Sequence, residues 1–132
     1  MTSTALRQSC PPGTCDCDRD VLLDDPNADA RILRLTLHEE RRLIERLDNV
    51  ASLQELEHLQ QRMEAQLGIR LQIGPGIEEI RVMRGIGMAF APQPGLCRKT
   101  RKAIPAAIRR CIKQHPEVAY ELLNSQDLLR DA

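Results

Sequence analysis

The sequence predicts a mostly helical α+β fold. Two short motifs of the capping-box type are each followed by apolar residues at helical spacing. A stretch of alternating apolar and polar residues comes next, which is typical of a β-strand with one buried face. A helical pattern rich in Lys and Arg then returns near the end of the chain. Helices packed around a small β-hairpin or sheet account for this order of elements.

The two capping boxes predict an antiparallel helical hairpin. In each motif a hydroxyl side chain stands three residues before a glutamate, so the hydroxyl can accept a hydrogen bond from an amide of the first helical turn. The motifs are Thr36–Glu39 and Ser52–Glu55, and the second helix should end at Gly68. Because few residues separate the two helices, they should fold back on each other.

The segment after Gly68 predicts a small sheet. Residues 69–73 alternate as a strand does, and the Gly-Pro-Gly at 74–76 makes a turn. Residues 77–84 fit either a strand or a short helix that begins with acids and ends with arginines. The strand is favoured, which predicts a β-hairpin between residues 69–73 and 78–84. Residues 86–90 also alternate and are compatible with an extension of the sheet.

The C-terminal part predicts short helices. From Leu96 onward the pattern is helical, and Pro105 and Pro116 each suit the first turn of a new helix, where a missing amide hydrogen does no harm. Cys111 lies on the apolar stripe of this segment and is interpreted as a core residue.

We expect residues 1–30 to form a flexible acidic tail and residues 31–132 to form a single α+β domain. The tail segment carries six aspartates, two arginines and three of the five cysteines, and it has little apolar surface to bury. A chain of 132 residues is long enough to bury a core without disulfides.

Composition argues against several classes of protein. No apolar stretch approaches the roughly 20 residues needed to span a bilayer, and residues 1–10 lack the apolar run of a secretory signal. We therefore expect a cytoplasmic protein without a membrane partner, whose thiols stay reduced. The chain has no Trp, one Phe and one Tyr, so it cannot build the aromatic platform on which single-stranded nucleic acid usually stacks.

Three cysteines near the start of the chain form the pattern C-x₄-C-x-C: Cys10, Cys15 and Cys17. Thiolates suit zinc and iron–sulfur clusters, and the Pro-Pro-Gly between the first two cysteines would turn the loop. The pattern indicates a metal site with zinc or an iron–sulfur cluster as cofactor. A fourth ligand has to come from elsewhere, and the candidates are Cys97, Cys111, His38, His58, Asp16 and Asp18. The competing interpretation is a disordered tail with three idle thiols.

The second candidate site is the basic segment, residues 97–113, which has seven Lys and Arg and no acid. The seven candidate anion- or partner-binding residues are Arg98, Lys99, Arg101, Lys102, Arg109, Arg110 and Lys113. Such a surface attracts polyanions such as nucleic acid. The whole chain has zero net charge, however, and its own acidic segment can neutralise the basic one. Cys97 precedes these cations at a predicted helix start, which favours a thiolate and makes it a candidate reactive thiol.

These features favour a small non-enzymatic accessory or adaptor protein. It would dock a protein partner through its helices and carry metal at its N-terminal thiols. No paired carboxylates and no nucleophile with an adjacent base stand out in the sequence. The alternative hypothesis is a nucleic-acid-binding regulator that uses residues 98–113, and a third is a thiol-dependent redox protein acting through Cys97.

Overall fold

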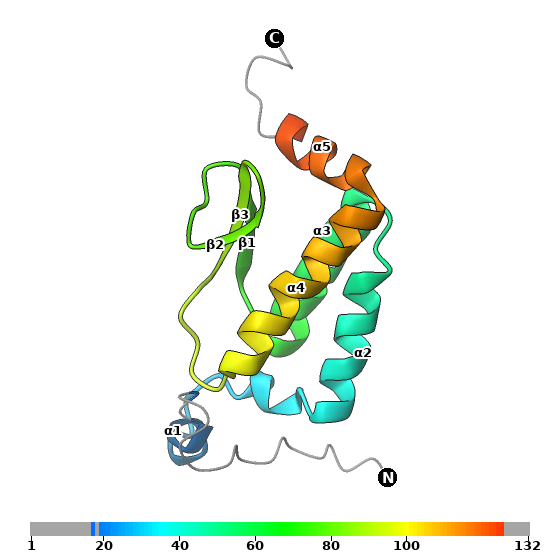
Figure 1. Ribbon diagram of the computed structural model, residues 1–132. Helices are drawn as coiled ribbons and strands as arrows, with labels where there is room; N and C mark the ends of the chain where they lie inside the picture. Colours follow the sequence, from blue (N-terminus) through cyan, green and yellow to red (C-terminus); the bar gives the residue numbers. More distant parts are fainter. Residues whose placement is uncertain (1–16, 18, 126–132) are drawn as a thin grey trace.

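The computed structural model describes residue 17 and residues 19–125 (Figure 1). The elements along the chain are α1 (Arg19–Asp24), the 3₁₀ turn η1 (Arg31–Arg34), α2 (Leu37–Asp48), α3 (Leu53–Leu67), β1 (Leu71–Gly74), β2 (Ile80–Met83), β3 (Ile86–Phe90), α4 (Arg98–Gln114) and α5 (Pro116–Ser125). The fold is α+β and mostly helical, so the predicted fold class is confirmed.

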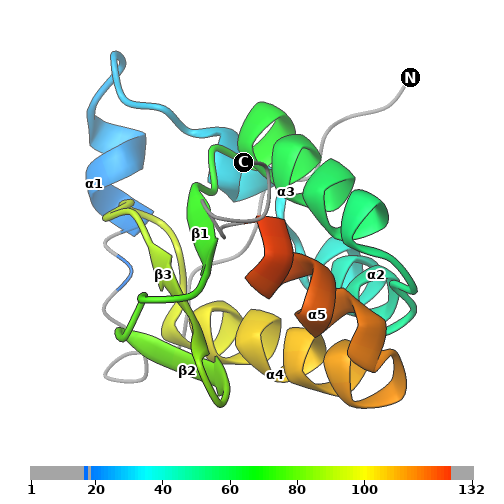
Figure 2. The same cartoon turned by 90° about the horizontal axis from the view of Figure 1, so that it is seen from above.

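Helix α4 occupies the centre of the fold. It packs against α2, β2 and α5, and the sheet and α2 lie on different sides of it (Figure 1). Helix α3 packs against η1 and α5. Helix α1 lies at the opposite end of the molecule from α5 (Figure 1), and a view from above shows the sheet on one side and α2 and α3 on the other (Figure 2). One apolar core joins these elements, and the fully buried side chains at its centre include Leu33, Leu47, Leu56, Met88 and Ile108.

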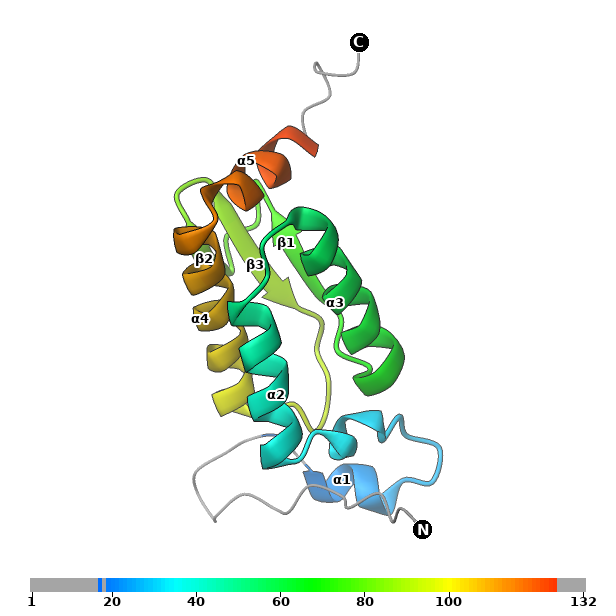
Figure 3. The same cartoon turned by 90° about the vertical axis from the view of Figure 1, so that its right-hand side faces the viewer.

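Both predicted helix caps form. The Thr36 hydroxyl accepts a hydrogen bond from the Glu39 amide at 3.3 Å, and the Ser52 hydroxyl accepts one from the Glu55 amide at 3.2 Å. Gly68 ends α3 in the left-handed conformation, with φ of 73°. Helices α2 and α3 run in opposite directions (Figure 3), so the antiparallel course of the predicted hairpin is confirmed. The two helices pack mainly on other elements, α2 on α4 and α3 on η1 and α5.

The strand order corrects the predicted pairing of residues 69–73 with 78–84. The sheet is antiparallel with the order β1-β3-β2, so β1 and β2 both pair with β3 and not with each other. A two-residue connection with Gly85 at φ 85° joins β2 to β3 and makes these two strands the hairpin. Strand β3 is central because Ile86, Gly87 and Met88 are all buried, whichever face of the sheet they point to.

Pro105 does not begin a new helix, contrary to the prediction. It lies inside α4, which continues unbroken from Arg98 to Gln114. A proline in a helix interior removes one hydrogen bond and costs about 3 kcal/mol. The core offsets this cost, because Ile104 and Ile108 are fully buried on the same helix, each contributing roughly 1.5–3 kcal/mol. Pro116 does begin a helix, α5, as predicted.

The described end of the predicted acidic tail contains secondary structure. Helix α1 lies within it, and Leu22 is 4% exposed and belongs to the apolar core. At Gly95, an added Cβ would lie 2.5 Å from side-chain atoms of both Leu22 and Ile32, so this part of the chain lies close to the loop before α4. The rest of the tail, residues 1–16 and 18, lies outside the described residues.

Within residues 17 and 19–125, no helix combines the length and the apolar character that a membrane span needs.

Candidate functional site

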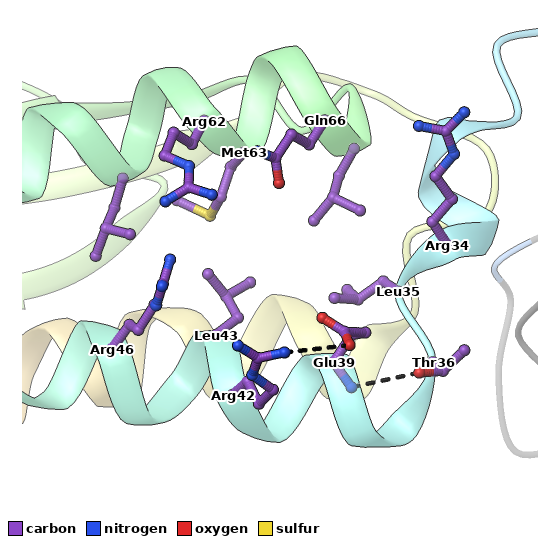
Figure 4. A pocket seen from close by; sticks show the side chains of 12 residues that line it. Arg34, Leu35, Thr36, Glu39, Arg42, Leu43, Arg46, Arg62, Met63 and Gln66 are labelled. Atoms are coloured by element: carbon purple, nitrogen blue, oxygen red, sulfur yellow. Dashed lines mark hydrogen bonds and ion pairs between the residues drawn. The ribbon is translucent and has the colours of Figure 1, made fainter. Parts of the chain in front are cut away.

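A groove of about 580 Å³ lies between α2 and α3 (Figure 4). We call it the α2–α3 groove. Its apolar side chains are Leu35, Leu43, Leu59, Met63 and Leu67, and its arginines are Arg34, Arg42, Arg46 and Arg62. A single carboxylate, that of Glu39, lines it as well. The groove therefore combines an apolar floor with a strongly cationic rim.

The groove exists because the two helices of the hairpin pack on different neighbours. Helix α2 packs against α4, whereas α3 packs against η1 and α5. Each helix buries one face, with Leu47 of α2 and Leu56 of α3 at 0% exposure. Leu43 and Leu67, which line the groove, stay half-buried. The hairpin thus leaves an apolar strip between its helices that no described element covers.

The arginines of the groove are poorly neutralised. Arg46 on α2 and Arg62 on α3 point toward each other across the groove (Figure 4). Arg42 lies 3.7 Å from Glu39 one turn earlier in α2, which is a weak surface pair. Among the described residues, no carboxylate forms an ion pair with Arg34, Arg46 or Arg62. Two facing guanidinium groups repel each other, so the arrangement favours an anion between them.

The groove continues toward the α2–α3 connection into a second hollow of about 500 Å³. Arg42, Arg46 and Arg62 line both hollows. The second one adds the carboxylates of Glu45 and Glu55, so its charge is mixed. The positive charge is therefore concentrated in the first hollow, which Arg34 of η1 also lines.

The basic segment does not form one continuous surface. Arg109 donates to the Arg81 carbonyl of β2 at 3.0 and 2.6 Å, and Arg110 donates to the Asp48 carboxylate of α2 at 2.7 and 3.3 Å. The hydrogen bond that Arg110 donates to Asp48 is also the main reason why the pKa of Arg110 is raised. These two guanidinium groups tie α4 to β2 and to α2.

The other basic residues lie toward the two ends of α4. Arg98, Lys99 and Lys102 are exposed in its first turns, where Arg101 is half-buried. Lys113 lies in its last turn, beside an apolar hollow between α4, α5 and β2. A helix rises 1.5 Å per residue, so about 17 Å separates Lys99 from Arg110 along the axis.

The thiols divide between the two ends of α4. Cys97 is the N-cap residue of α4 and is 8% exposed, and Cys17 is 7% exposed. The Gly95 amide donates a hydrogen bond to the Cys17 carbonyl, so Cys17 lies against the loop that leads to Cys97 and α4. Cys111 is fully buried near the other end, and burial raises the pKa of its thiol to about 11. Cys10 and Cys15 lie outside the described residues.

Another charged cluster stabilises the C-terminal end of α3. Arg31 donates to the Glu64 and Ala65 carbonyls at 3.1 and 3.0 Å, and it pairs with Asp29 at 2.6 Å. The hydrogen bond from Arg31 lowers the pKa of the Asp29 carboxyl to about 2. The pair contributes stability above pH 4 that is lost as the pH falls toward 2.

Comparison with protein family models, with curated proteins and with solved structures found no match to this chain. Among the described residues, no three His, Cys, Asp or Glu side chains lie together in a way that could hold a metal ion. Two of the three predicted N-terminal ligands are not among those residues.

Sequence reasoning missed the arginines of the α2–α3 groove. A signal was present, because Arg42 and Arg46 are four residues apart and share a helix face beside Leu43. The sequence does not show where Arg62 of the second helix lies relative to the helix face that carries Arg42 and Arg46. Only the divergent packing of α2 and α3 brings Arg46 and Arg62 to opposite sides of one groove.

Proposed function

We propose that this protein is a non-enzymatic adaptor that docks an acidic amphipathic helix of a protein partner in the α2–α3 groove. The observation that carries this proposal is the pair formed by Arg46 and Arg62, which face each other above an apolar floor. We place the adaptor in the cytoplasm, where thiols stay reduced.

A helix is the occupant that fits this shape. The groove is bounded by two antiparallel helices, and a third helix can lie between them with its apolar face on the floor, as in a helical bundle. The half-buried Leu43 and Leu67 offer contact area to leucines spaced three and four residues apart on the incoming helix.

The charge of the groove selects an acidic partner. A carboxylate placed between Arg46 and Arg62 would relieve their mutual repulsion and form charge-assisted hydrogen bonds. A basic helix would add to that repulsion and be rejected. Because the arginines are partly exposed, they should affect the association rate and its salt dependence as well as the affinity.

The test uses a fluorescent acidic peptide with leucines at helical spacing and glutamates beside them. Its binding to the full chain is followed by anisotropy. We expect saturable binding that Arg46→Glu and Arg62→Glu each weaken by about tenfold or more. The matched control is Arg41→Glu, which changes an exposed arginine of α2 outside the groove and should leave binding unchanged. A peptide with lysine in place of each glutamate should not bind.

Two outcomes would overturn the proposal. One is a loss of binding in Arg41→Glu equal to the loss in the groove variants, since that would reflect nonspecific charge attraction. The other is an absence of peptide binding together with salt-sensitive binding of duplex DNA that depends on Arg98, Lys99 and Lys102. That result would favour the nucleic-acid-binding hypothesis.

A further inference from the structure

Helix α5 has apolar residues on its outer side as well as on the side that packs inward. Val118, Ala119 and Leu122 are buried, whereas Tyr120 is 66% and Leu123 37% exposed. The helix lies at one end of the molecule (Figure 1), and it packs mainly on α3 and α4. The two exposed side chains are three residues apart and therefore neighbours on the helix surface.

A hollow of about 390 Å³ adjoins this pair of side chains and extends to α4 and β2. We call it the α4–α5 hollow. Its apolar lining consists of Val82, Met83, Ile112, Ala119, Tyr120 and Leu123. Single exposed apolar residues are ordinary, but an exposed aromatic side chain beside an apolar hollow marks a docking surface.

The two helices of this surface carry opposite charges. Arg109 and Lys113 of α4 line the hollow, and no carboxylate of the described residues does. Glu117 and Glu121 of α5 are exposed. The members of each pair are four residues apart, which is about 6 Å along a helix, so the two pairs have the same spacing.

The cations of this surface are not neutralised within one chain. In the part of the chain that the structure describes, no ion pair joins Arg109 or Lys113 to a carboxylate. Arg109 donates two hydrogen bonds to the Arg81 carbonyl, which is uncharged. Glu117 lies 3.4 Å from His115 instead. The cations of one chain can therefore pair with carboxylates of another.

We propose that this surface is a dimer interface, in which Tyr120 of each chain enters the α4–α5 hollow of a second copy. A two-fold axis places the same surface on both sides of the contact, so that surface has to complement itself. Here one chain supplies the aromatic side chain, the hollow, the cations and the carboxylates. Because Glu121 adjoins Tyr120 and Lys113 lines the hollow, entry of Tyr120 brings Glu121 of one chain toward Lys113 of the other.

The dimer would present two α2–α3 grooves. Among the described residues, none that lines the α2–α3 groove also lines the α4–α5 hollow. Loss of dimerisation therefore leaves each groove intact, and this inference and the proposed function can fail separately. A partner with two acidic helices would bind the dimer more tightly than the monomer, because its second helix binds within the same complex.

Sedimentation velocity of the full chain measures self-association, with a reductant present to exclude disulfide-linked dimers. We expect a reversible dimer, because a contact centred on one short helix buries less surface than a permanent dimer does. Tyr120 is the only tyrosine and the chain has no Trp, so its fluorescence reports on this surface alone. Quenching of that fluorescence by acrylamide should fall as the dimer forms.

Substitution of exposed apolar residues locates the interface. Tyr120→Ala should weaken dimerisation by about tenfold or more, since buried tyrosines carry much of the binding energy of an interface. Leu37→Ala is the matched control. It removes another exposed apolar side chain, 52% exposed at the start of α2, and should leave dimerisation unchanged.

Charge reversal distinguishes a second copy from any other occupant. Lys113→Glu and Glu121→Lys should each weaken self-association, because like charges then meet across the two-fold axis. An equimolar mixture of these two variants should dimerise about as the wild type does, because each contact again joins opposite charges. Both side chains are exposed, so the circular dichroism of the variants should match the wild type. A mixture that stays monomeric would contradict the two-fold arrangement.

Three further results would overturn the inference. A wild-type chain that stays monomeric at about 1 mM would remove the dimer. A dimer that Tyr120→Ala and Lys113→Glu leave unchanged would lie on another surface. A monomer whose tyrosine fluorescence changes and saturates with an added fatty acid would assign the hollow to a small amphiphile instead.

Discussion

At the scale of single residues, two positions show how the fold constrains the side chain: Gly87 has no room for one, and the ring of Pro105 is buried inside a helix. Gly87 lies in the central strand β3, and an added Cβ would lie 1.8 Å from the Ile77 carbonyl oxygen. The obstacle is backbone, which cannot rotate away as a long side chain can. Pro105 is the opposite case, because its ring is fully buried inside α4 and the surrounding core tolerates it. Both residues show tertiary contacts overriding local preference.

Gly87→Ala should destabilise the protein by about 3 kcal/mol or more, because the methyl group forces β3 away from residue 77. Urea unfolding followed by circular dichroism measures the change. The control is Gly76→Ala, at a glycine with φ of 85° and no atom within 4 Å of the added Cβ. It should cost only the roughly 1–2 kcal/mol of left-handed backbone strain. Equal losses in the two variants would contradict the close approach at Gly87.

At the scale of elements, local signals determine the helices and fail to determine the sheet. The caps at Thr36 and Ser52 depend on atoms within three residues of each other, so the sequence predicts them directly. The sheet order depends on which strand is buried on both faces, and that is decided by helices distant in the sequence. The predicted hairpin of residues 69–73 with 78–84 paired neighbouring segments, whereas β3 lies between them.

Ser52→Ala should lower the free energy of unfolding by about 1 kcal/mol, because the Glu55 amide at the start of α3 loses its hydrogen-bond acceptor. Thermal and urea unfolding both measure the effect. Gln54→Ala changes an exposed residue of the same first turn and should alter stability by less than about 0.5 kcal/mol. If both variants lose the same amount, the cap does not stabilise α3.

At the scale of the whole molecule, α1 forms part of the same core as the helices and the sheet. Leu22 of α1 packs with Gly95 and Ile32, which puts the N-terminal segment beside the first turn of α4. The Gly95 amide also donates a hydrogen bond to the Cys17 carbonyl, which ties residue 17 to the loop before α4. The α2–α3 groove likewise depends on the whole molecule, since it opens where α2 packs against α4 and α3 packs against η1.

Leu22→Ala should destabilise the protein by about 2–4 kcal/mol, because it removes a side chain that is only 4% exposed from the core. Leu23→Ala is the matched control: the neighbouring leucine is 49% exposed and should cost less than about 0.5 kcal/mol. Denaturant unfolding of the wild type and both variants measures the change. An unaffected Leu22→Ala would mean that the core does not depend on α1.

The sequence by itself determined the elements whose causes are local. Capping hydroxyls, the glycine that ends α3 and the alternation of β1 act over a few residues, so they can be read without the fold. The sequence also identified the seven basic residues and the thiols, but it did not show which of them lie together in the fold. Tertiary structure alone decided the strand order, the burial of Pro105, the facing of Arg46 and Arg62, and the approach of Cys17 to Gly95. The physical reason is that each of these depends on a shared core, in which segments far apart in the chain compete to bury apolar surface.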